Sequence, residues 1–255
     1  MDQGRTEHGR LARHDGVELA WARTPGRSPA VVFLPGYRSD MQGAKALDTE
    51  RFCAAHGIGC LRLDYSGHGQ SGGAFTDGTI SQWAADATLL LDRLTDGPVV
   101  LVGSSMGGWI MLLVALARPA RVAGLLGIAA APDFTEDLVW NTMTLPFRAA
   151  LLRDGVLHMP SDYGDPTPMT ARLIEDGRTR LLLRAPIPLH CPVRLLHGQR
   201  DADVPWDTSL RLASQLQSPD VQVTLVKDGD HRLSRPADLA LLRRTLDTLL
   251  FQDGA

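Results

Sequence analysis

One charge-free stretch of twenty residues, Pro98 to Ala117, constrains the fold of this chain more than any other segment. Its length would nominally let a single helix span a bilayer. Its middle, however, reads Gly103-Ser104-Ser105-Met106-Gly107-Gly108, which is a turn composition. We therefore interpret the stretch as a buried strand over 99–102, a sharp turn and a buried helix over 106–117. A chain of 255 residues is long enough to cover both elements.

The same unit, an apolar run followed by a helical pattern, recurs along the chain. Apolar runs predict further strands over 30–34, 58–63, 122–130, 193–196 and 221–226. Helical spacing predicts helices over 43–56, 80–94, 205–216 and 236–251. Segments 11–13 and 17–23 flank His14-Asp15-Gly16 and predict a hairpin. Alternating strands and helices indicate a mostly parallel, twisted sheet with helices on both faces, an α/β fold.

The alternation fails between Pro132 and Pro188, where helical patches surround a turn-rich centre over Pro160 to Pro166. We interpret this segment as an insertion that lies over the sheet. The prediction is one α/β domain built from residues 1–131 and 186–255, with a short cap over residues 132–185.

Composition excludes several classes of protein. The chain has 26 Lys and Arg against 29 Asp and Glu, a net charge of −3, and this balance argues against nucleic acid binding. The three cysteines, Cys53, Cys60 and Cys191, lack metal-type spacing and suggest a reducing compartment. Met1 to Asp15 has no apolar signal segment, and core strands expected from near Leu11 leave no room for a transit peptide. We expect a cytoplasmic protein with no membrane span, metal or cofactor; its oligomeric state is not predicted.

The turn at Gly103-Ser104-Ser105-Met106-Gly107 matches the pattern G-x-S-x-G. In this motif a strand enters, a helix leaves, and the tight turn holds the central serine exposed above the sheet. Because the predicted strand and helix flank the motif on the correct sides, Ser105 is the candidate nucleophile.

A second copy of the same letters, Gly69 to Gly73, centres on Ser71. No strand ends beside it and no helix begins there, so we interpret Ser71 as a loop residue. The same loop also spells G-x-G-x-x-G with Gly67, Gly69 and Gly72. A dinucleotide site needs a helix to open at once, and the next helical pattern begins only near residue 80.

A nucleophilic serine needs a histidine base and an acid that orients it, in the chain order serine, acid, histidine. His231 follows the last predicted strand and is the candidate base. Asp201 and Asp203 both follow the strand over 193–196, and Asp133 after the strand over 122–130 is a third candidate acid. Two other histidines lie near this edge of the sheet. His197 precedes the acid loop and is expected to be structural, and His68 is expected to shape its own loop or to line the mouth of the site.

A developing oxyanion needs two hydrogen-bond donors. The backbone N–H of Met106, directly after the nucleophile, is the first candidate. The second is the backbone N–H of Tyr37, because Pro35-Gly36-Tyr37 follows the strand over 30–34 and Gly36 permits close approach.

These motifs, together with Asp64-Tyr65-Ser66-Gly67-His68-Gly69, resemble the alpha/beta-hydrolase superfamily. The stretches around Ser105, Val204-Pro205-Trp206 and Asp230-His231-Arg232 are similar to one branch of it. That branch contains mitochondrial palmitoyl-protein thioesterases that also hydrolyse acyl glucuronides, with bacterial relatives. The resemblance implies Asp201 as the triad acid and hydrolysis of carboxylic esters or thioesters through an acyl-enzyme. The substrate would be a small acyl ester or thioester, or an S-acylated protein.

Two alternatives remain open at this point. The same triad supports carbon–carbon bond hydrolysis and cofactor-free perhydrolysis, and the fold also hosts non-catalytic ligand receptors. The apolar residues of the cap could either line an acyl pocket or pack against the core: Phe134, Leu138, Trp140, Met143, Leu145, Phe147, Leu151 and Leu152. Five basic cap residues could either meet a substrate carboxylate or face solvent: Arg148, Arg153, His158, Arg178 and Arg180.

Overall fold

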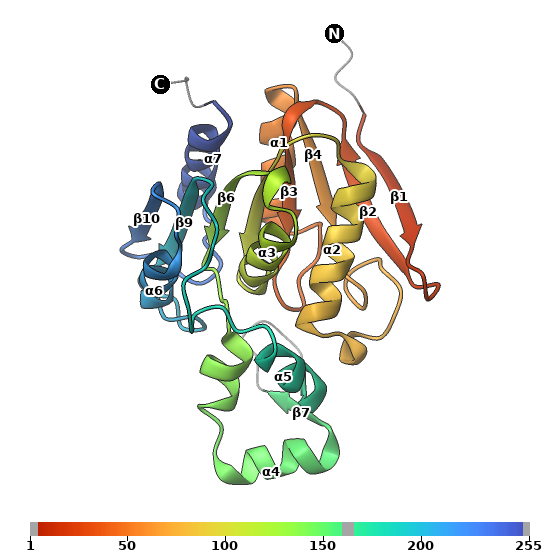
Figure 1. Ribbon diagram of the computed structural model, residues 1–255, viewed down its shortest axis with the longest axis vertical. Helices are drawn as coiled ribbons and strands as arrows, with labels where there is room; N and C mark the ends of the chain where they lie inside the picture. Colours follow the sequence, from red (N-terminus) through yellow and green to blue (C-terminus); the bar gives the residue numbers. More distant parts are fainter. Residues whose placement is uncertain (1–4, 160–165, 252–255) are drawn as a thin grey trace.

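The fold was analysed in a computed structural model that describes residues 5–159 and 166–251. Its centre is an eight-stranded sheet with the strand order β1-β2-β4-β3-β5-β6-β9-β10 (Figure 1). The strands are β1 (Glu7–Ala12), β2 (Glu18–Thr24), β3 (Arg27–Leu34), β4 (Ile58–Leu63), β5 (Val99–Ser104), β6 (Val122–Ile128), β9 (Val193–Gly198) and β10 (Val221–Val226). Strands β1 and β2 pair antiparallel, β2 pairs antiparallel with β4, and all other neighbours are parallel. The predicted hairpin and mostly parallel sheet are confirmed.

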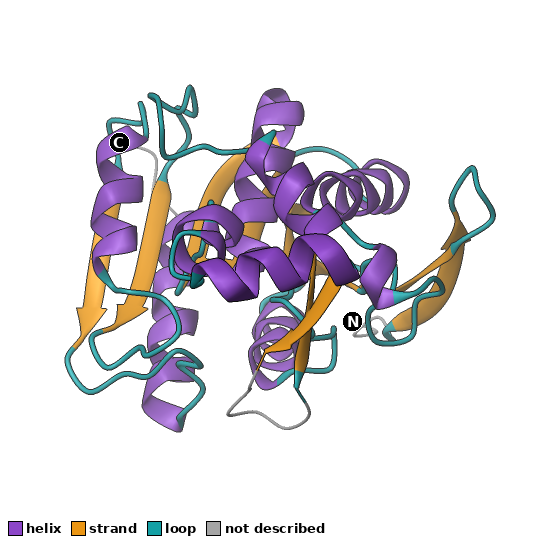
Figure 2. Ribbon diagram, turned by 90° about the horizontal axis from the view of Figure 1, so that it is seen from below, coloured by secondary structure: helices purple, strands orange, loops and turns teal. Residues whose placement is uncertain are grey.

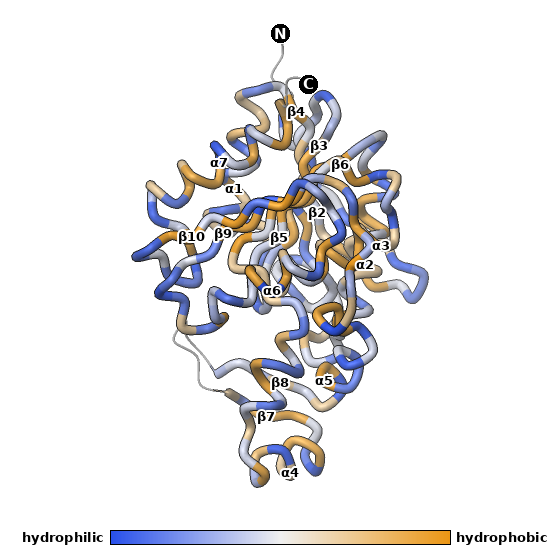
Figure 3. Tube along the Cα trace, turned by 60° about the vertical axis from the view of Figure 1, so that its left-hand side comes forward, coloured by the Kyte–Doolittle hydropathy of each residue, from blue (hydrophilic) through white to orange (hydrophobic). Residues whose placement is uncertain are grey.

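Five helices cover the two faces of the sheet: α1 (Ala44–Ala55), α2 (Ile80–Leu94), α3 (Met106–Ala117), α6 (Asp207–Gln215) and α7 (Pro236–Leu250). Alternate residues of the central strands face opposite sides, so that Val32 and Leu101 join one core while Val31 and Val100 join the other. The first core also contains residues of α2, α3 and α6, and the second contains residues of α1 and α7. Apolar residues are concentrated along the central strands (Figure 3). The two-sided covering explains why these strands have continuous apolar sequences.

The segment predicted as a cap holds more regular structure than its sequence suggested. It contains a short π-helical turn, η3 (Thr135–Trp140), then α4 (Leu145–Asp154), β7 (Val156–Met159), β8 (Thr167–Thr170) and α5 (Ala171–Arg178). Strands β7 and β8 form a separate antiparallel pair, which four-residue segments could not signal. These elements lie at one end of the sheet, with α4 farthest from it (Figure 1). Seen from that end, helices lie in front of the strands of the sheet (Figure 2). Residues 160–165 of the predicted turn-rich centre lie outside the described residues.

The remaining differences concern element ends. Strand β5 continues to Ser104 and β9 to Gly198, while β6 ends at Ile128, two residues before its predicted end. The stretch from 98 to 117 divides into β5, a turn and α3. Among the described helices, none is both long enough and apolar enough to cross a bilayer.

Candidate active site

Ser105 lies at the turn between β5 and α3 in a strained backbone conformation. Its φ of 55° and ψ of −121° are unusual for a residue with a side chain. Two hydrogen bonds fix the residue: Ser105 N–H donates to the Ile128 carbonyl at 2.9 Å, and Ala131 N–H donates to the Ser105 carbonyl at 3.0 Å. A Cβ atom at Gly107 would lie 2.0 Å from the Leu34 carbonyl oxygen, so the turn tolerates no side chain there. Close packing against the end of β3 and two hydrogen bonds to residues at the end of β6 therefore hold the turn in this form.

His231 lies on the loop between β10 and α7, 126 residues from Ser105 in sequence. Its Nε2 atom is 3.1 Å from Ser105 Oγ, and its Nδ1 atom is 2.8 Å from Asp201 Oδ2. The structure thus brings the three residues predicted from sequence into one hydrogen-bonded chain. With Nδ1–H donated to the carboxylate, Nε2 is free to accept the serine proton.

Asp201 follows β9 and has a completely buried side chain. Its Oδ1 atom accepts hydrogen bonds from the backbone N–H groups of Asp203 at 2.9 Å and Val204 at 2.8 Å. Burial alone raises the pKa of Asp201, but hydrogen bonds from His197 and His231 and the charge on His231 together hold it well below its usual range. Asp201 therefore remains ionised beside His231.

The other two candidate acids lie differently. Asp203 is exposed and contributes a backbone N–H to Asp201. Asp133 is fully buried, and its carboxylate accepts hydrogen bonds from Leu182 N–H at 2.7 Å and Leu183 N–H at 2.8 Å. It thereby ties the end of the cap to the segment that follows β6.

The oxyanion donors were predicted at Met106 and Tyr37. Gly36 lies against Ser105, because a Cβ there would be 3.3 Å from Ser105 Cβ. Within the described residues, neither the Tyr37 N–H nor the Met106 N–H donates a hydrogen bond to the protein. The two predicted oxyanion donors therefore have no protein acceptor among the described residues.

The comparisons with known proteins agree with this geometry. The sequence profile of the alpha/beta hydrolase family matches residues 31–241. The chain belongs to the alpha/beta hydrolase family.

Individual relatives cover almost the whole chain. The human mitochondrial palmitoyl-protein thioesterase ABHD10 is 43% identical over 242 residues, which are 94% of this chain and 79% of the relative. The mouse alpha/beta hydrolase domain-containing protein 10 superposes with a TM-score of 0.89 at 40% identity, covering 95% of this chain and 98% of the mouse chain. A putative hydrolase from Agrobacterium vitis S4 superposes with a TM-score of 0.92 at 41% identity, covering 97% and 99%.

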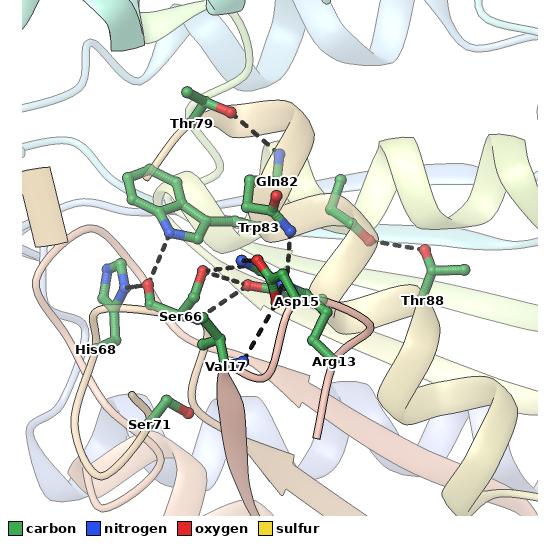
Figure 4. A network of polar contacts seen from close by, with 12 residues as sticks. Arg13, Asp15, Val17, Ser66, His68, Ser71, Thr79, Gln82, Trp83 and Thr88 are labelled. Atoms are coloured by element: carbon green, nitrogen blue, oxygen red, sulfur yellow. Dashed lines mark hydrogen bonds and ion pairs between the residues drawn. The ribbon is translucent and has the colours of Figure 1, made fainter. Parts of the chain in front are cut away.

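In this hydrolase the second G-x-S-x-G sequence has a structural position. Ser71 Oγ donates to the Asp64 carbonyl at 2.7 Å and accepts from Ala20 N–H at 2.8 Å, so it joins β2 to the loop after β4. Its neighbour Ser66 is the centre of a polar network (Figure 4). Ser66 N–H and Oγ both donate to the buried Asp86, at 2.9 and 2.6 Å. The next long helix begins only at residue 80, as predicted.

His68 belongs to the same loop and is 4% exposed. Its ring packs edge-on against Trp83, with centroids 5.0 Å apart, and its Nδ1 is 3.3 Å from the Ser66 carbonyl (Figure 4). The Phe75 ring contacts both, with centroids 4.9 Å from His68 and 5.9 Å from Trp83. Burial lowers the pKa of His68 to about 4. Of the two predicted roles, the structure shows the residue shaping its loop.

Two contacts of the site had no sequence signal. His197 is fully buried, and its Nε2 is 3.1 Å from Asp201 Oδ2. Lys45, on α1, donates hydrogen bonds to the carbonyl of Arg232 and to Ser234 Oγ, and so contacts the loop that carries His231. Burial lowers the pKa of Lys45 to about 8. Because 187 residues separate Lys45 from Arg232, only the tertiary fold reveals this contact.

The cap residues divide between packing, solvent and a cavity. Leu145, Phe147 and Leu152 are exposed on α4. Leu138 lines a cavity of about 190 Å³, whose other lining residues are Pro132, Asp137, Leu183, Pro205, Asp207, Thr208 and Arg211. Arg148 and Arg178 lie over the Trp140 ring, and Arg180 Nε donates to Ser81 Oγ at 2.7 Å. These three basic residues therefore bind other side chains of the protein.

One group of described residues has the ligand types of a metal site. Atoms of Asp201, Asp203 and His231 lie within 4.8 Å of one another. His231 Nδ1 is at hydrogen-bond distance from Asp201 Oδ2, and this contact accounts for their proximity without an ion.

Proposed function

We propose that this chain hydrolyses carboxylic esters or thioesters through an acyl-enzyme on Ser105. One observation carries the proposal: Ser105 Oγ, His231 Nε2, His231 Nδ1 and Asp201 Oδ2 form a continuous hydrogen-bonded chain, with contacts of 3.1 and 2.8 Å. A hydroxyl in that arrangement can lose its proton to the imidazole as it attacks.

In the first half of the reaction Ser105 Oγ attacks the acyl carbon while His231 Nε2 takes its proton. Asp201 accepts the His231 Nδ1–H hydrogen bond and stabilises the imidazolium that forms. The tetrahedral oxyanion receives hydrogen bonds from the N–H groups of Tyr37 and Met106. His231 then protonates the departing alcohol or thiol, which leaves Ser105 acylated.

In the second half, a water molecule gives a proton to His231 and attacks the acyl-enzyme. The oxyanion is held by the same two donors, and collapse of the intermediate returns the proton to Ser105 Oγ as the free acid departs. Every step uses groups of this chain and water, and no metal or cofactor takes part.

The proposed substrate has an apolar acyl chain. The names of the relatives point to palmitoyl thioesters, and an S-acylated protein is one such substrate. Two lining residues of the Leu138 cavity are chain neighbours of residues that contact the triad: Pro132 follows Ala131, which hydrogen-bonds to Ser105, and Pro205 follows Val204, which hydrogen-bonds to Asp201. We assign the acyl chain to this cavity.

The compartment is also part of the proposal. The relatives are named as mitochondrial, which the sequence of this chain did not predict. We propose the cytoplasm, a reducing compartment in which the three free cysteines would stay reduced. Subcellular fractionation tests this assignment.

A substrate panel tests the activity. Purified protein is assayed with acyl thioesters, p-nitrophenyl esters and acyl glucuronides, beside the Ser105→Ala variant, and is labelled with a fluorophosphonate probe. We expect turnover of thioesters or esters and labelling at Ser105, both lost in the variant. A non-catalytic receptor would turn over none of these substrates, and turnover that persists in Ser105→Ala would contradict the proposed nucleophile.

A further inference from the structure

His197 lies at the end of β9, four residues before Asp201, and its side chain is fully buried. Its Nε2 atom is 3.1 Å from Asp201 Oδ2 and 3.0 Å from the Val204 carbonyl oxygen. Its Nδ1 atom is 2.7 Å from the hydroxyl of Ser209, which is also fully buried on α6. The ring is therefore held on both sides.

The hydrogen-bond partners fix the protonation of this ring. A carbonyl oxygen can only accept, and Asp201 remains ionised and also only accepts. The hydrogen must therefore be on Nε2 of His197, which donates to both oxygens. In the neutral imidazole Nδ1 then accepts from the Ser209 hydroxyl. Hydrogen bonds are therefore donated from Ser209 to His197 and from His197 to Asp201.

His197 and His231 share one carboxylate oxygen. His231 Nδ1 donates to Asp201 Oδ2 at 2.8 Å, and His197 Nε2 donates to the same atom at 3.1 Å. The second donor withdraws negative charge from the oxygen that stabilises the His231 imidazolium. It also holds the carboxylate in the orientation that the backbone N–H groups of Asp203 and Val204 favour at Oδ1.

We propose that His197 is a positioning residue that orients Asp201 and moderates its attraction for the His231 cation. This inference rests on the proposed serine hydrolase function. It extends the hydrogen-bonded chain from three side chains to five, from Ser105 through His231, Asp201 and His197 to Ser209.

The charged groups around these five hydrogen-bonded side chains must stay the same in every variant that is compared. Three titratable side chains lie close to Asp201: His197 on β9, His231 on the loop before α7, and Asp203 on the same loop as Asp201. The loop of His231 also carries Asp230 and Arg232, and Lys45 of α1 binds the Arg232 carbonyl. All of these remain unchanged in variants at positions 197 and 209.

Two amide substitutions at position 197 distinguish a residue that orients Asp201 from one that only fills space. Glutamine at position 197 can place an N–H donor near the original Nε2, whereas the shorter asparagine reaches only as far as Nδ1. We would measure kcat and KM for His197→Gln and His197→Asn, with the pH dependence of kcat/KM and of fluorophosphonate labelling. For His197→Asn we expect the acid limb of both profiles to move to higher pH by about 0.5 to 1, because Asp201 loses a donor. In the same variant kcat should fall about tenfold with KM unchanged.

His197→Gln should keep the acid limb of both pH profiles at its wild-type position and keep most of the wild-type kcat. If the acid limb of His197→Asn stays in place, or if both variants lose activity equally without moving it, the residue only fills space and the inference is wrong. Ser209→Ala provides a second test that leaves the ring present, and it should move the limb in the same direction by a smaller amount. A stationary limb in Ser209→Ala would overturn the inference even if His197→Asn fails to fold. Absence of labelling and turnover in the wild-type protein would instead refute the proposed function, and the inference with it.

Discussion

At the scale of single residues, two serines share one sequence motif but have opposite surroundings. Ser105 has a strained backbone, and within the described part of the chain its Oγ atom hydrogen-bonds only to His231. Ser71 uses its hydroxyl twice, as a donor to Asp64 and as an acceptor from Ala20. The first serine is therefore available for chemistry, whereas the second stabilises the loop.

Alanine substitutions should separate these two roles. Ser105→Ala is expected to lower kcat by roughly 10⁴- to 10⁶-fold while leaving Tm almost unchanged, because it removes the nucleophile and no structural bond. Ser71→Ala should keep kcat within about tenfold but lose about 1–2 kcal/mol of stability, since two backbone groups lose their partner. Thermal melts and steady-state kinetics on both proteins check this. The reverse pattern would mean that the nucleophile is Ser71.

The two acidic residues of the loop after β9 should differ in the same way. Asp201→Asn is expected to lower kcat by about 10⁴-fold, because an amide supports the wrong His231 tautomer and leaves its cation without a partner. Asp203→Asn serves as the control and should change kcat less than tenfold, since its backbone N–H to Asp201 is retained. Equal losses in kcat would contradict the assignment of Asp201 as the orienting acid.

At the scale of elements, the cap is attached to the body unevenly. Around α5, Asp176 accepts from Ser81 N–H at 2.8 Å, and Trp109 Nε1 donates to the Arg180 carbonyl at 3.0 Å. At β8, Tyr37 Oη donates to the Pro168 carbonyl at 2.6 Å, so a candidate oxyanion residue also holds the cap. Helix α4 lies beyond these contacts with three large apolar side chains exposed. In contrast, η3 contributes Asp137 and Leu138 to the lining of the cavity of about 190 Å³.

Acyl chain-length preference tests the assignment of this cavity. Each buried methylene contributes about 0.8 kcal/mol, roughly fourfold in binding, so kcat/KM should rise from acetyl to octanoyl substrates until the cavity is full. Leu138→Trp should shift the optimum to shorter chains by occupying the cavity. Leu145→Trp is the matched control, because Leu145 is 78% exposed on α4. Maximal activity on acetyl or propionyl esters, or identical chain-length profiles for both variants, would refute the acyl assignment.

At the scale of the whole molecule, the sheet brings together loops that are far apart in sequence. Gly36, Ser105, Asp201 and His231 each follow a different parallel strand, and parallel strands end at one edge of the sheet. The loop after β4 ends at the same edge and is fixed by Ser66 and by the buried ring of His68. The protonation of His68 is therefore expected to affect both the free energy of unfolding and the loop that it fixes at this edge.

The stability of the protein should consequently fall in mild acid. Burial lowers the pKa of His68 from 6.5 to about 4, so between these values the unfolded chain binds a proton that the folded chain does not. The free energy of unfolding therefore decreases as pH falls from 6.5 to 4, by up to about 3 kcal/mol from this residue. His68→Phe keeps an aromatic ring without the titration and should show a flatter curve in urea unfolding at pH 7, 6, 5 and 4. Parallel curves for the two proteins would show that His68 does not cause the decrease.

The sequence alone determined most of the elements of the sheet and the candidate nucleophile. Continuous apolar runs predicted strands, and the structure confirms them at β3, β4, β5, β6, β9 and β10. Strands β4, β5 and β9 are buried along their whole length, whereas β10 at the edge of the sheet is only partly buried. Ser105 could be selected over Ser71 because its motif is local: the strand, the small residues and the helix that the turn requires are adjacent in the chain. The β7–β8 pair escaped prediction because four-residue strands carry too little periodicity to identify them.

The tertiary structure decided what depends on side-chain direction and on distant contacts. Residues alone left three carboxylates open; the fold turns Asp133 toward Leu182 and Leu183, and Asp201 toward His231. The contacts of His197 with Asp201 and of Lys45 with the Arg232 carbonyl became visible in the same way. The physical reason is that a strand or a tight turn is specified by neighbouring residues, whereas a hydrogen bond across the molecule depends on how loops from different strands pack at one edge of the sheet.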